Sequence, residues 1–421
     1  MTQVLLLATT TGYQIRSFGE AADVLGVRLV FASDRCDRLE DPWWDRAIPV
    51  KFHDQSGSVG AVVAAVAGQP IDGVLAVGDR PTILAAHLAA ALQLPGNPPE
   101  AAAMSRNKLA TRRAFQAAGL STPSFEAVAV ASNPSEVARG RPYPVVIKPL
   151  ALSGSRGVMR VDTEADFVPA FLRLRHLLQS IDIRSERDGA HDQVLIESFV
   201  SGREYAVEGV LTAGTLQVFA IFDKPDPLDG PFFEETIYLT PSRAAPATQQ
   251  AIVQAIVDAS RALGLRHGPV HAECRVSERG VFVLEVAPRP IGGLCSRAVR
   301  LRSAEGRSAS LEEVLLRHAI GQDVHGFVRE DDAAGVMMIP IPGRGVLRGL
   351  SGVEAACAIP GIDDVHITAK VDETLVPLPE GRSYLGFIFA RGGSPAIVER
   401  SLRAAHGCLE FAIDRALTII G

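Results

Sequence analysis

The sequence is poor in several features that mark specialised classes of protein. No apolar run approaches the ~20 residues that a helix needs to span a bilayer, so no membrane partner is expected. The five cysteines are scattered, with no Cys-x-x-Cys pair, which favours reduced thiols in a cytoplasmic protein over a disulfide framework. The formal net charge of -6 lacks the basic excess that a nucleic-acid partner requires.

Lysine is scarce as well, because only five of the 42 basic residues are lysines: Lys51, Lys108, Lys148, Lys224 and Lys370. An ammonium is a compact charge that a planar guanidinium does not replace. A lysine that persists on this background can therefore mark a site that needs an ammonium. For any single lysine, drift in codon usage is the simpler explanation.

Alternating strand and helix patterns organise the first quarter of the chain. Apolar runs at 4–8, 28–32 and 73–77 are separated by helix-period stretches around 16–25, 59–67 and 82–92. Buried strands joined by helices predict a parallel sheet that is covered on both faces. A Pro/Gly/Asn cluster at 94–99 ends this unit, so we expect an α/β domain over residues 1–97.

The rest of the chain has short strands in hairpins and isolated helices. We expect helices at 105–118 (starting at Ser105), 247–263, 309–320 and 395–413, a mobile polar loop at 180–192, and a β-rich tail from 335. Strands are expected at 145–149, 157–161, 194–199, 205–211, 216–222, 270–276 and 281–286. The predicted fold class is α/β followed by α+β, with segments 1–97, 98–210, 211–330 and 331–421.

Two carboxylates on one predicted hairpin carry the strongest chemical signal. Residues 278–280 suit a three-residue turn with glycine last, and that register places Glu273 directly opposite Glu285. Strand alternation puts Glu273 on one face with His271, and Glu285 on one face with Val283. Like charges about 5 Å apart are destabilising unless they share a proton or hold a cation. Oxygen-only ligands favour Mg²⁺, and the alternative is a solvated pair on an exposed hairpin.

A lysine followed by a Gly/Ser loop is the second signal. Lys148 ends a buried apolar strand, and the loop contains Ser153, Gly154 and Ser155. Glycine lets backbone N–H groups approach a polyphosphate, and serine adds hydroxyl donors. No Gly-Lys-Ser/Thr opens a helix here, so the loop is not a Walker P-loop. Taken alone, a plain hairpin turn explains it nearly as well.

A pair of acids around a short linker is the third signal. Glu197 ends an apolar strand and Glu204 follows seven residues later, a spacing that suits an adenosine clamp. Backbone groups of Phe199 and Val200 would read the adenine edge, and Glu204 would accept hydrogen bonds from the ribose. In isolation, Glu204 is more simply a surface acid at a turn.

In this order and spacing, the segments from Lys108 to Arg289 resemble the ATP-grasp superfamily. The resemblance implies a pre-ATP-grasp parallel α/β domain, a bipartite ATP-grasp domain and a β-rich C-terminal domain. It implies that Lys108 and Lys148 contact the phosphates of ATP while the Gly/Ser loop closes over them, and that residues 197–200 hold the adenine, with Glu204 on the ribose.

By the same resemblance, Glu273 and Glu285 would hold Mg²⁺, with Mn²⁺ as an alternative. Many family members have Asn two residues after the second metal-binding glutamate, where this chain has Ala287. A second magnesium would then lose a ligand or take a water instead. Carboxylating members related to the purine pathway can also have Ala at this position.

The C-terminal part of the chain indicates which branch of the superfamily it resembles. The stretches Ile-Pro-Ile-Pro-Gly-Arg-Gly at 339–345 and Ser-Tyr-Leu-Gly-Phe-Ile-Phe-Ala-Arg at 383–391 are similar to the C-terminal domain of L-amino-acid ligases. By this resemblance, the substrate pockets lie near Arg289, Gly292 and Gly293, under a mobile segment at 226–241 with two exposed phenylalanines.

The resemblance also suggests roles for single residues in catalysis. Arg289 would bind the acyl phosphate and act in catalysis together with Glu285. Glu235 would hold a substrate ammonium. His271 shares the face of Glu273 but does not occupy a ligand position of the family, so it would support the metal ligands, face the substrate or have a structural role.

The expected function is that of an ATP-dependent carboxylate–amine ligase. It would join a small acid to an amine, both expected to be amino acids, through an acyl phosphate, releasing ADP and phosphate. The alternatives are a carboxylase of the same superfamily that uses bicarbonate, and a non-catalytic ATP-binding protein. We also expect a homodimer.

Overall fold

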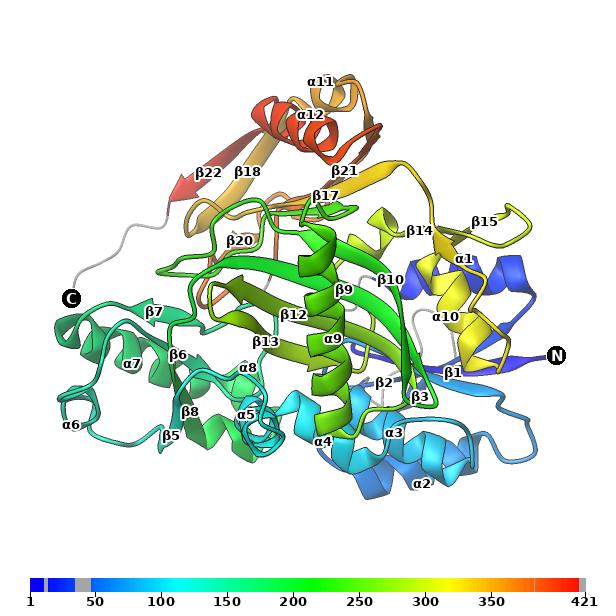
Figure 1. Cartoon of the computed structure of the whole chain (residues 1–421), viewed down its shortest axis with the longest axis horizontal. Helices are drawn as coiled ribbons and strands as arrows, with labels where there is room; N and C mark the ends of the chain where they lie inside the picture. The colour runs from blue at the N-terminus through cyan, green and yellow to red at the C-terminus, as the bar shows by residue number, and fades with distance from the viewer. Residues whose placement is uncertain (11–13, 35–46, 382, 416–421) are drawn as a thin grey trace.

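The computed structural model describes residues 1–10, 14–34, 47–381 and 383–415 (Figure 1). The N-terminal sheet is parallel, as predicted, with strand order β3-β2-β1-β4. Its strands are β1 (Gln3–Ala8), β2 (Arg28–Ser33), β3 (Ile48–Pro49) and β4 (Gly73–Val77). Alternate side chains of β1 pack against α1 (Ile15–Leu25) on one face and against α2 (Gln55–Ala65) and α3 (Thr82–Ala91) on the other.

Two short helices connect this sheet to the next lobe: α4 (Pro99–Arg106) and α5 (Lys108–Ala117). The predicted helix start at Ser105 was wrong. The side chain of Asn107 caps α5 by accepting hydrogen bonds from the backbone N–H groups of Leu109 and Ala110. This cap places Lys108 at the first position of α5.

The second lobe is an antiparallel sheet of order β5-β8-β6-β7. Its elements are β5 (Phe125–Ala129), β6 (Val145–Pro149), β7 (Met159–Val161) and β8 (Gln193–Ser198), with α6 (Pro134–Ala138) and α7 (Glu164–Leu178). The predicted loop at 180–192 was wrong, because it contains α8 (Ile181–Arg184) and the 3₁₀ helix η1 (Gly189–Asp192). Ile183 is fully buried in the core of this lobe, which anchors the segment.

The largest sheet has eight strands in the order β13-β12-β9-β10-β11-β17-β21-β19. Their bounds are β9 (Arg203–Thr212), β10 (Thr215–Asp223), β11 (Ile237–Thr240), β12 (Gly268–Ser277), β13 (Gly280–Ala287), β17 (Ala333–Ile339), β19 (Ile362–Ile367) and β21 (Gly386–Gly392). Helix α9 (Pro246–Leu263) packs on one face of the β9, β12 and β13 part (Figure 1). The sheet joins strands from both sides of residue 330, and the predicted segment boundaries stay predictions.

Smaller elements complete the described chain. One three-stranded sheet contains β14 (Arg300–Arg302), β15 (Ser308–Ser310) and β16 (Val328–Arg329), beside η2 (Cys295–Ala298) and α10 (Leu311–Ala319). The other contains β18 (Gly345–Ser351), β20 (Thr374–Leu375) and β22 (Glu410–Arg415), beside α11 (Val353–Cys357) and α12 (Pro395–Gly407). The predicted helix at 395–413 therefore ends early, because residues from Glu410 pair with β18. Among the described helices, none has the length and apolar character to cross a membrane.

Candidate active site

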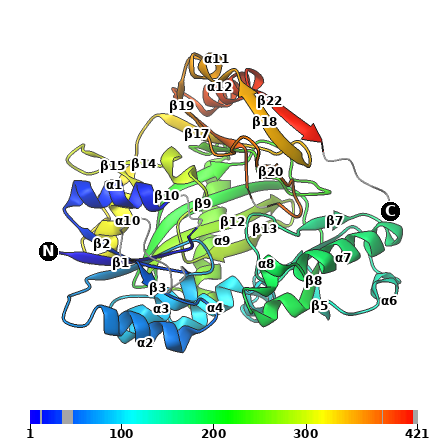
Figure 2. The ribbon, with the colours of Figure 1, turned by 180° about the vertical axis from the view of Figure 1, so that it is seen from behind.

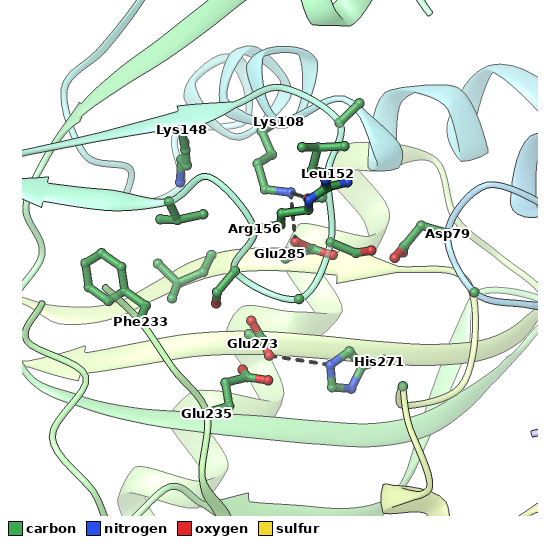
Figure 3. A pocket seen from close by; sticks show the side chains of 18 of the residues that line it. Asp79, Lys108, Lys148, Leu152, Arg156, Phe233, Glu235, His271, Glu273 and Glu285 are labelled. Carbon is green, nitrogen blue, oxygen red and sulfur yellow. Dashed lines mark hydrogen bonds and ion pairs between the residues drawn. The ribbon is translucent and has the colours of Figure 1, made fainter. Parts of the chain in front are cut away.

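A cavity of about 670 Å³ lies where the parts of the chain meet (Figure 3). Its walls come from the carboxyl ends of β1 and β4, the Gly/Ser loop after β6, the face of the large sheet opposite α9, and β21. Every site residue predicted from the sequence lines this cavity: Lys108, Lys148, Ser153, Gly154, Ser155, Glu197, Phe199, Val200, Glu204, Glu235, His271, Glu273, Glu285, Arg289, Gly292 and Gly293. The fold thus brings together residues that are up to 185 positions apart, from 108 to 293.

The hairpin of β12 and β13 presents both predicted metal ligands to the cavity. Glu273 pairs directly with Glu285, as the sequence predicted. The predicted turn was wrong, because Gly280 belongs to the strand ladder and an unpaired Leu284 restores the register. This bulge also turns Glu285 to the cavity while Val283 packs under α9, so the predicted common face of these two residues was wrong.

The chemistry of this pair fits a magnesium ion. Both groups are carboxylates, and hard oxygen ligands are what Mg²⁺ prefers. Each acid also lies near a cation, since Lys108 Nζ is 3.2 Å from Glu285 and Lys224 Nζ is 2.9 Å from Glu273. Ala287, two residues after Glu285, is buried and carries no ligand atom on its side chain.

Lys148 is held by a buried ionic triad. The carboxylate of Glu197 contacts Lys148 Nζ and lies 2.6 Å from Nε of Arg112, which is fully buried on α5. Burial lowers the pKa of Lys148 to about 8, although the charge of Glu197 opposes this shift. Burial would raise the pKa of Glu197, but Arg112 and Lys148 lower it to about 2. The side chain of Glu197 therefore positions Lys148, and Arg112 is a supporting residue that sequence reasoning missed.

Lys108 connects the Gly/Ser loop to the hairpin of β12 and β13. Its Nζ donates a hydrogen bond to the backbone carbonyl of Leu152 at 2.9 Å and also lies near Glu285, as Figure 3 shows. In the loop itself, Gly154 and Ser155 have φ values of +62° and +55°. Two consecutive left-handed residues fold the backbone sharply, a conformation that glycine adopts easily and serine seldom.

Lys224 is the largest omission from the predicted site. Its buried ammonium lies 2.8 Å from Glu204, 2.5 Å from Glu235 and 2.9 Å from Glu273. Carboxylate oxygens of these three acids lie within 4.8 Å of one another. Burial would lower the pKa of Lys224, but the three acids raise it well above its ordinary value. The scarcity of lysine named Lys224 only as one of five lysines, and no motif separated it from the others.

The acids around Lys224 differ in their protonation. Burial raises the pKa of Glu235 to about 7, and the adjacent charge of Glu273 adds to this effect while Lys224 opposes it. The pKa of Glu273 stays well below its ordinary value, because Lys224 and His271 outweigh the effect of burial. Glu235 and Glu273 thus form an acid pair that can share a proton near neutral pH.

An arginine-rich wall surrounds the predicted adenine region. Arg275 lies 2.8 Å from Glu204 and donates to the backbone carbonyl of Val200 at 2.8 Å. The guanidinium of Arg160 lies 4.2 Å from the ring centroid of Phe199. The ring of Phe233 stacks on that of Phe199, with 6.5 Å between the two ring centroids. Glu204 is thus a buried acid with cationic partners, and the reading as a surface acid at a turn was wrong.

Two further ion pairs lie in the part of the cavity where the sequence predicts the substrates. Arg289 Nε lies 2.8 Å from Asp79, at the end of β4, and its Nη2 lies 4.0 Å from Glu285. His271 contacts the buried Glu208 through Nδ1 and lies 3.6 Å from Glu273 through Nε2. Burial would lower the pKa of His271, but Glu208 raises it to about 9. Sequence reasoning missed both Asp79 and Glu208, since neither belongs to a motif.

The segment at 226–241 lies against the second lobe. Its Phe232 pairs with Met159 through a β-bridge, and Arg160 donates from its backbone to Pro231 at 2.9 Å. Phe233 is 9% exposed and lines the cavity, whereas Phe232 is half-buried. The prediction of two exposed phenylalanines was therefore wrong.

Comparisons with known families cover most of the chain. Residues 141–298 match the ATP-grasp domain, residues 19–96 the ATP-grasp N-terminal domain, and residues 337–414 the L-amino acid ligase C-terminal domain 2. The crystal structure of L-amino acid ligase from Bacillus licheniformis superposes with a TM-score of 0.81 at 26% identity, and the match covers 99% of each chain.

Other relatives share less of the molecule. Carnosine synthase 1 from Gallus gallus is 30% identical over 259 residues, which are 58% of this chain and 27% of that protein. The N5-carboxyaminoimidazole ribonucleotide synthetase from Thermotoga maritima has the same fold, with a TM-score of 0.69, 16% identity and coverage of 98% and 100% of the two chains. Three curated relatives align over 64%, 53% and 27% of their own lengths, so the chain spans less than two thirds of each. Together, the domain matches and the shared fold show that the chain belongs to the ATP-grasp superfamily.

Proposed function

We propose that the protein is an ATP-dependent carboxylate–amine ligase that joins two small substrates, both amino acids, through an amide bond. The observation that carries this proposal is the pairing of cations with cavity-facing carboxylates. Lys108 and Arg289 lie beside Glu285, and Lys224 lies beside Glu273. Lys148 lines the same cavity and is paired with Glu197. Such an arrangement suits a triphosphate whose terminal phosphoryl group is transferred.

The nucleotide would lie along the wall formed by the second lobe. The backbone at Phe199 and Val200 would contact the adenine, and Glu204 the ribose hydroxyls. Lys108, Lys148 and the Gly/Ser loop at 153–155 would hold the phosphates. Glu273 and Glu285 would hold magnesium, which neutralises phosphate charge during transfer; Mn²⁺ is an alternative.

Phosphoryl transfer would be the first step. A carboxylate oxygen of the first substrate attacks the γ-phosphorus of ATP, which forms an acyl phosphate as the bond to ADP breaks. Arg289, beside Glu285 and fixed by Asp79, is placed to neutralise charge on the transferred group. Asp79 thus orients Arg289 before the substrates arrive.

Amide formation would be the second step. The neutral amine of the second substrate attacks the acyl carbon, inorganic phosphate leaves, and the amine gives up a proton. Glu235 lies beside the substrate end of the cavity and would bind the ammonium group of the first amino acid. Gly292 and Gly293 line the same end and leave space beside Arg289.

The carboxylase alternative has weaker support. Ala287 is compatible with it, and the synthetase from Thermotoga maritima shares the fold. A likeness at 16% identity supports the fold alone, whereas the tail of this chain matches an L-amino acid ligase domain. A non-catalytic role leaves the buried acid and lysine clusters without a purpose, and such clusters are costly to bury.

An isotope experiment tests the acyl phosphate. Incubation with ATP and an amino acid whose carboxylate carries ¹⁸O should yield inorganic phosphate with one ¹⁸O atom when amide forms. Phosphate without the label would contradict activation of that carboxylate. The predicted homodimer is a separate proposal, which sedimentation analysis would test.

A further inference from the structure

A loop of the C-terminal domain lies on the Gly/Ser loop. The loop follows β20 and descends toward the lobe that carries β7 and α7 in both views (Figures 1 and 2). The backbone carbonyl of Pro379 accepts a hydrogen bond from the N–H of Gly157 at 2.8 Å. The carbonyl of Glu380 accepts one from Nε of Arg156, also at 2.8 Å. Residues 379–380 thus contact the end of the Gly/Ser loop directly.

The side chain of Glu380 makes a two-point contact with α7. Its two carboxylate oxygens lie 2.5 and 2.8 Å from Nε and Nη2 of Arg173. Burial would raise the pKa of Glu380, but the hydrogen bonds and charge of Arg173 lower it. The same guanidinium lies 5.1 Å from the ring centroid of Phe232, in the segment at 226–241. Arg173 therefore connects the C-terminal loop, α7 and this segment.

Two residues that follow Glu380 in the sequence line the cavity. They are Tyr384 and Phe387, and Phe387 lies beside Gly293. Residues 379–380 contact the Gly/Ser loop, so neighbouring parts of the C-terminal domain reach two places on the cavity wall.

We propose that Glu380 is a positioning residue that holds the Gly/Ser loop closed over the phosphates of ATP. The effect of this loop position on catalysis rests on the proposed function. Ser153 and Gly154 of this loop are exposed, so the position of the loop depends on contacts such as those from residues 379–380. The half-exposed ion pair of Glu380 with Arg173 adds little to the stability of the whole protein. Its loss should therefore change the position of the loop without unfolding the protein.

Hydrogen exchange of residues 153–157 tests the loop directly, without any amino-acid substrate. In the wild-type protein, a non-hydrolysable ATP analogue with Mg²⁺ should slow exchange in this loop. In Glu380→Gln, the same saturating analogue should give about fivefold weaker protection, the effect expected for a two-point ion pair. Equal protection in both proteins would overturn the proposal. Because this readout needs no ligase activity, it separates the failure of this inference from the failure of the proposed function.

A double-variant cycle tests whether Glu380 acts through Arg173. Glu380→Gln and Arg173→Gln should each raise KM for ATP and increase the ADP formed per amide, and the double variant should be no worse than the more impaired single variant. Additive effects would contradict action through this pair. Asp414→Asn is the matched control, since it removes a 2.7 Å ion pair to Arg348 within the C-terminal domain. This control should behave as the wild type in both assays, and a change as large as that of Glu380→Gln would overturn the assignment.

Discussion

Glu273 and Glu285 lie directly opposite each other on β12 and β13, and an unpaired Leu284 lets both side chains point into the cavity. Without the extra residue, strand alternation would place Glu285 on the face of Val283, under α9. Two carboxylates that lie so near each other tend to share a proton or bind a cation. The hairpin therefore presents a pair of ligands at the point where the triphosphate and the acyl substrate would meet.

The first prediction concerns these ligands. Glu285→Gln should lower kcat about 100-fold or more, because an amide is a poor ligand for Mg²⁺ and phosphoryl transfer depends on the metal. Circular dichroism should show an unchanged fold. Glu278→Gln, at the exposed turn of the same hairpin, is the control and should retain activity. Wild-type turnover in a folded Glu285→Gln protein would remove Glu285 from the site.

The second prediction concerns Lys148. Lys148→Met keeps the buried aliphatic packing and removes the ammonium, while Arg112 still neutralises Glu197. The affinity for ATP should fall roughly tenfold or more, which corresponds to the loss of about 1.4 kcal/mol. Isothermal titration calorimetry measures this affinity, and Lys51→Met is the control because Lys51 is exposed and does not line the cavity. Equal affinities in all three proteins would contradict the role of Lys148.

The third prediction concerns pH. The pKa of Lys148 is about 8 in the free protein, so the neutral amine dominates at higher pH. Since the ammonium form binds the triphosphate, ATP binding above pH 8 must take up a proton, and Kd should rise by up to about tenfold per pH unit. Titrations between pH 6.5 and 9.5 should show this slope in the wild type and not in Lys148→Met. The same slope in the variant would assign the proton to another group.

The fourth prediction concerns the segment at 226–241. Phe233 lines the cavity and packs against Phe199, whereas Phe232 packs outside against the second lobe. Phe233→Ala should admit water to the acyl phosphate, so ADP should form faster than amide. Phe232→Ala should uncouple the reaction less. Equal yields of ADP and amide in Phe233→Ala would show that this side chain does not exclude water.

The sequence predicted the elements whose periodic pattern is strong and the residues that belong to motifs. The parallel sheet and the pairing of Glu273 with Glu285 were predicted correctly. The face of Val283 was not, because a bulge depends on packing between strands rather than on a local pattern. The segment at 180–192 was misjudged because its polar residues hide Ile183, which the core of the lobe buries.

The supporting residues of the site could not be predicted from the sequence. Arg112, Glu208 and Asp79 each orient a predicted residue, yet each comes from an element distant in sequence. Their roles depend on which side chains the fold brings within hydrogen-bond distance. Lys224 was an intermediate case, because it was one of five lysines that the sequence analysis named, but no motif showed its three acidic partners.

The proposed ligase would use ATP to join a carboxylate to an amine. The most direct measurement is a screen of amino-acid pairs with Mg²⁺ and ATP, in which ADP, phosphate and amide product are quantified together, with bicarbonate as a separate arm. We predict that at least one pair yields ADP, phosphate and amide in equal amounts, and that bicarbonate alone yields no ADP above background. ADP formation driven by bicarbonate without any amide product from the amino acids would rule out a carboxylate–amine ligase and favour a carboxylase.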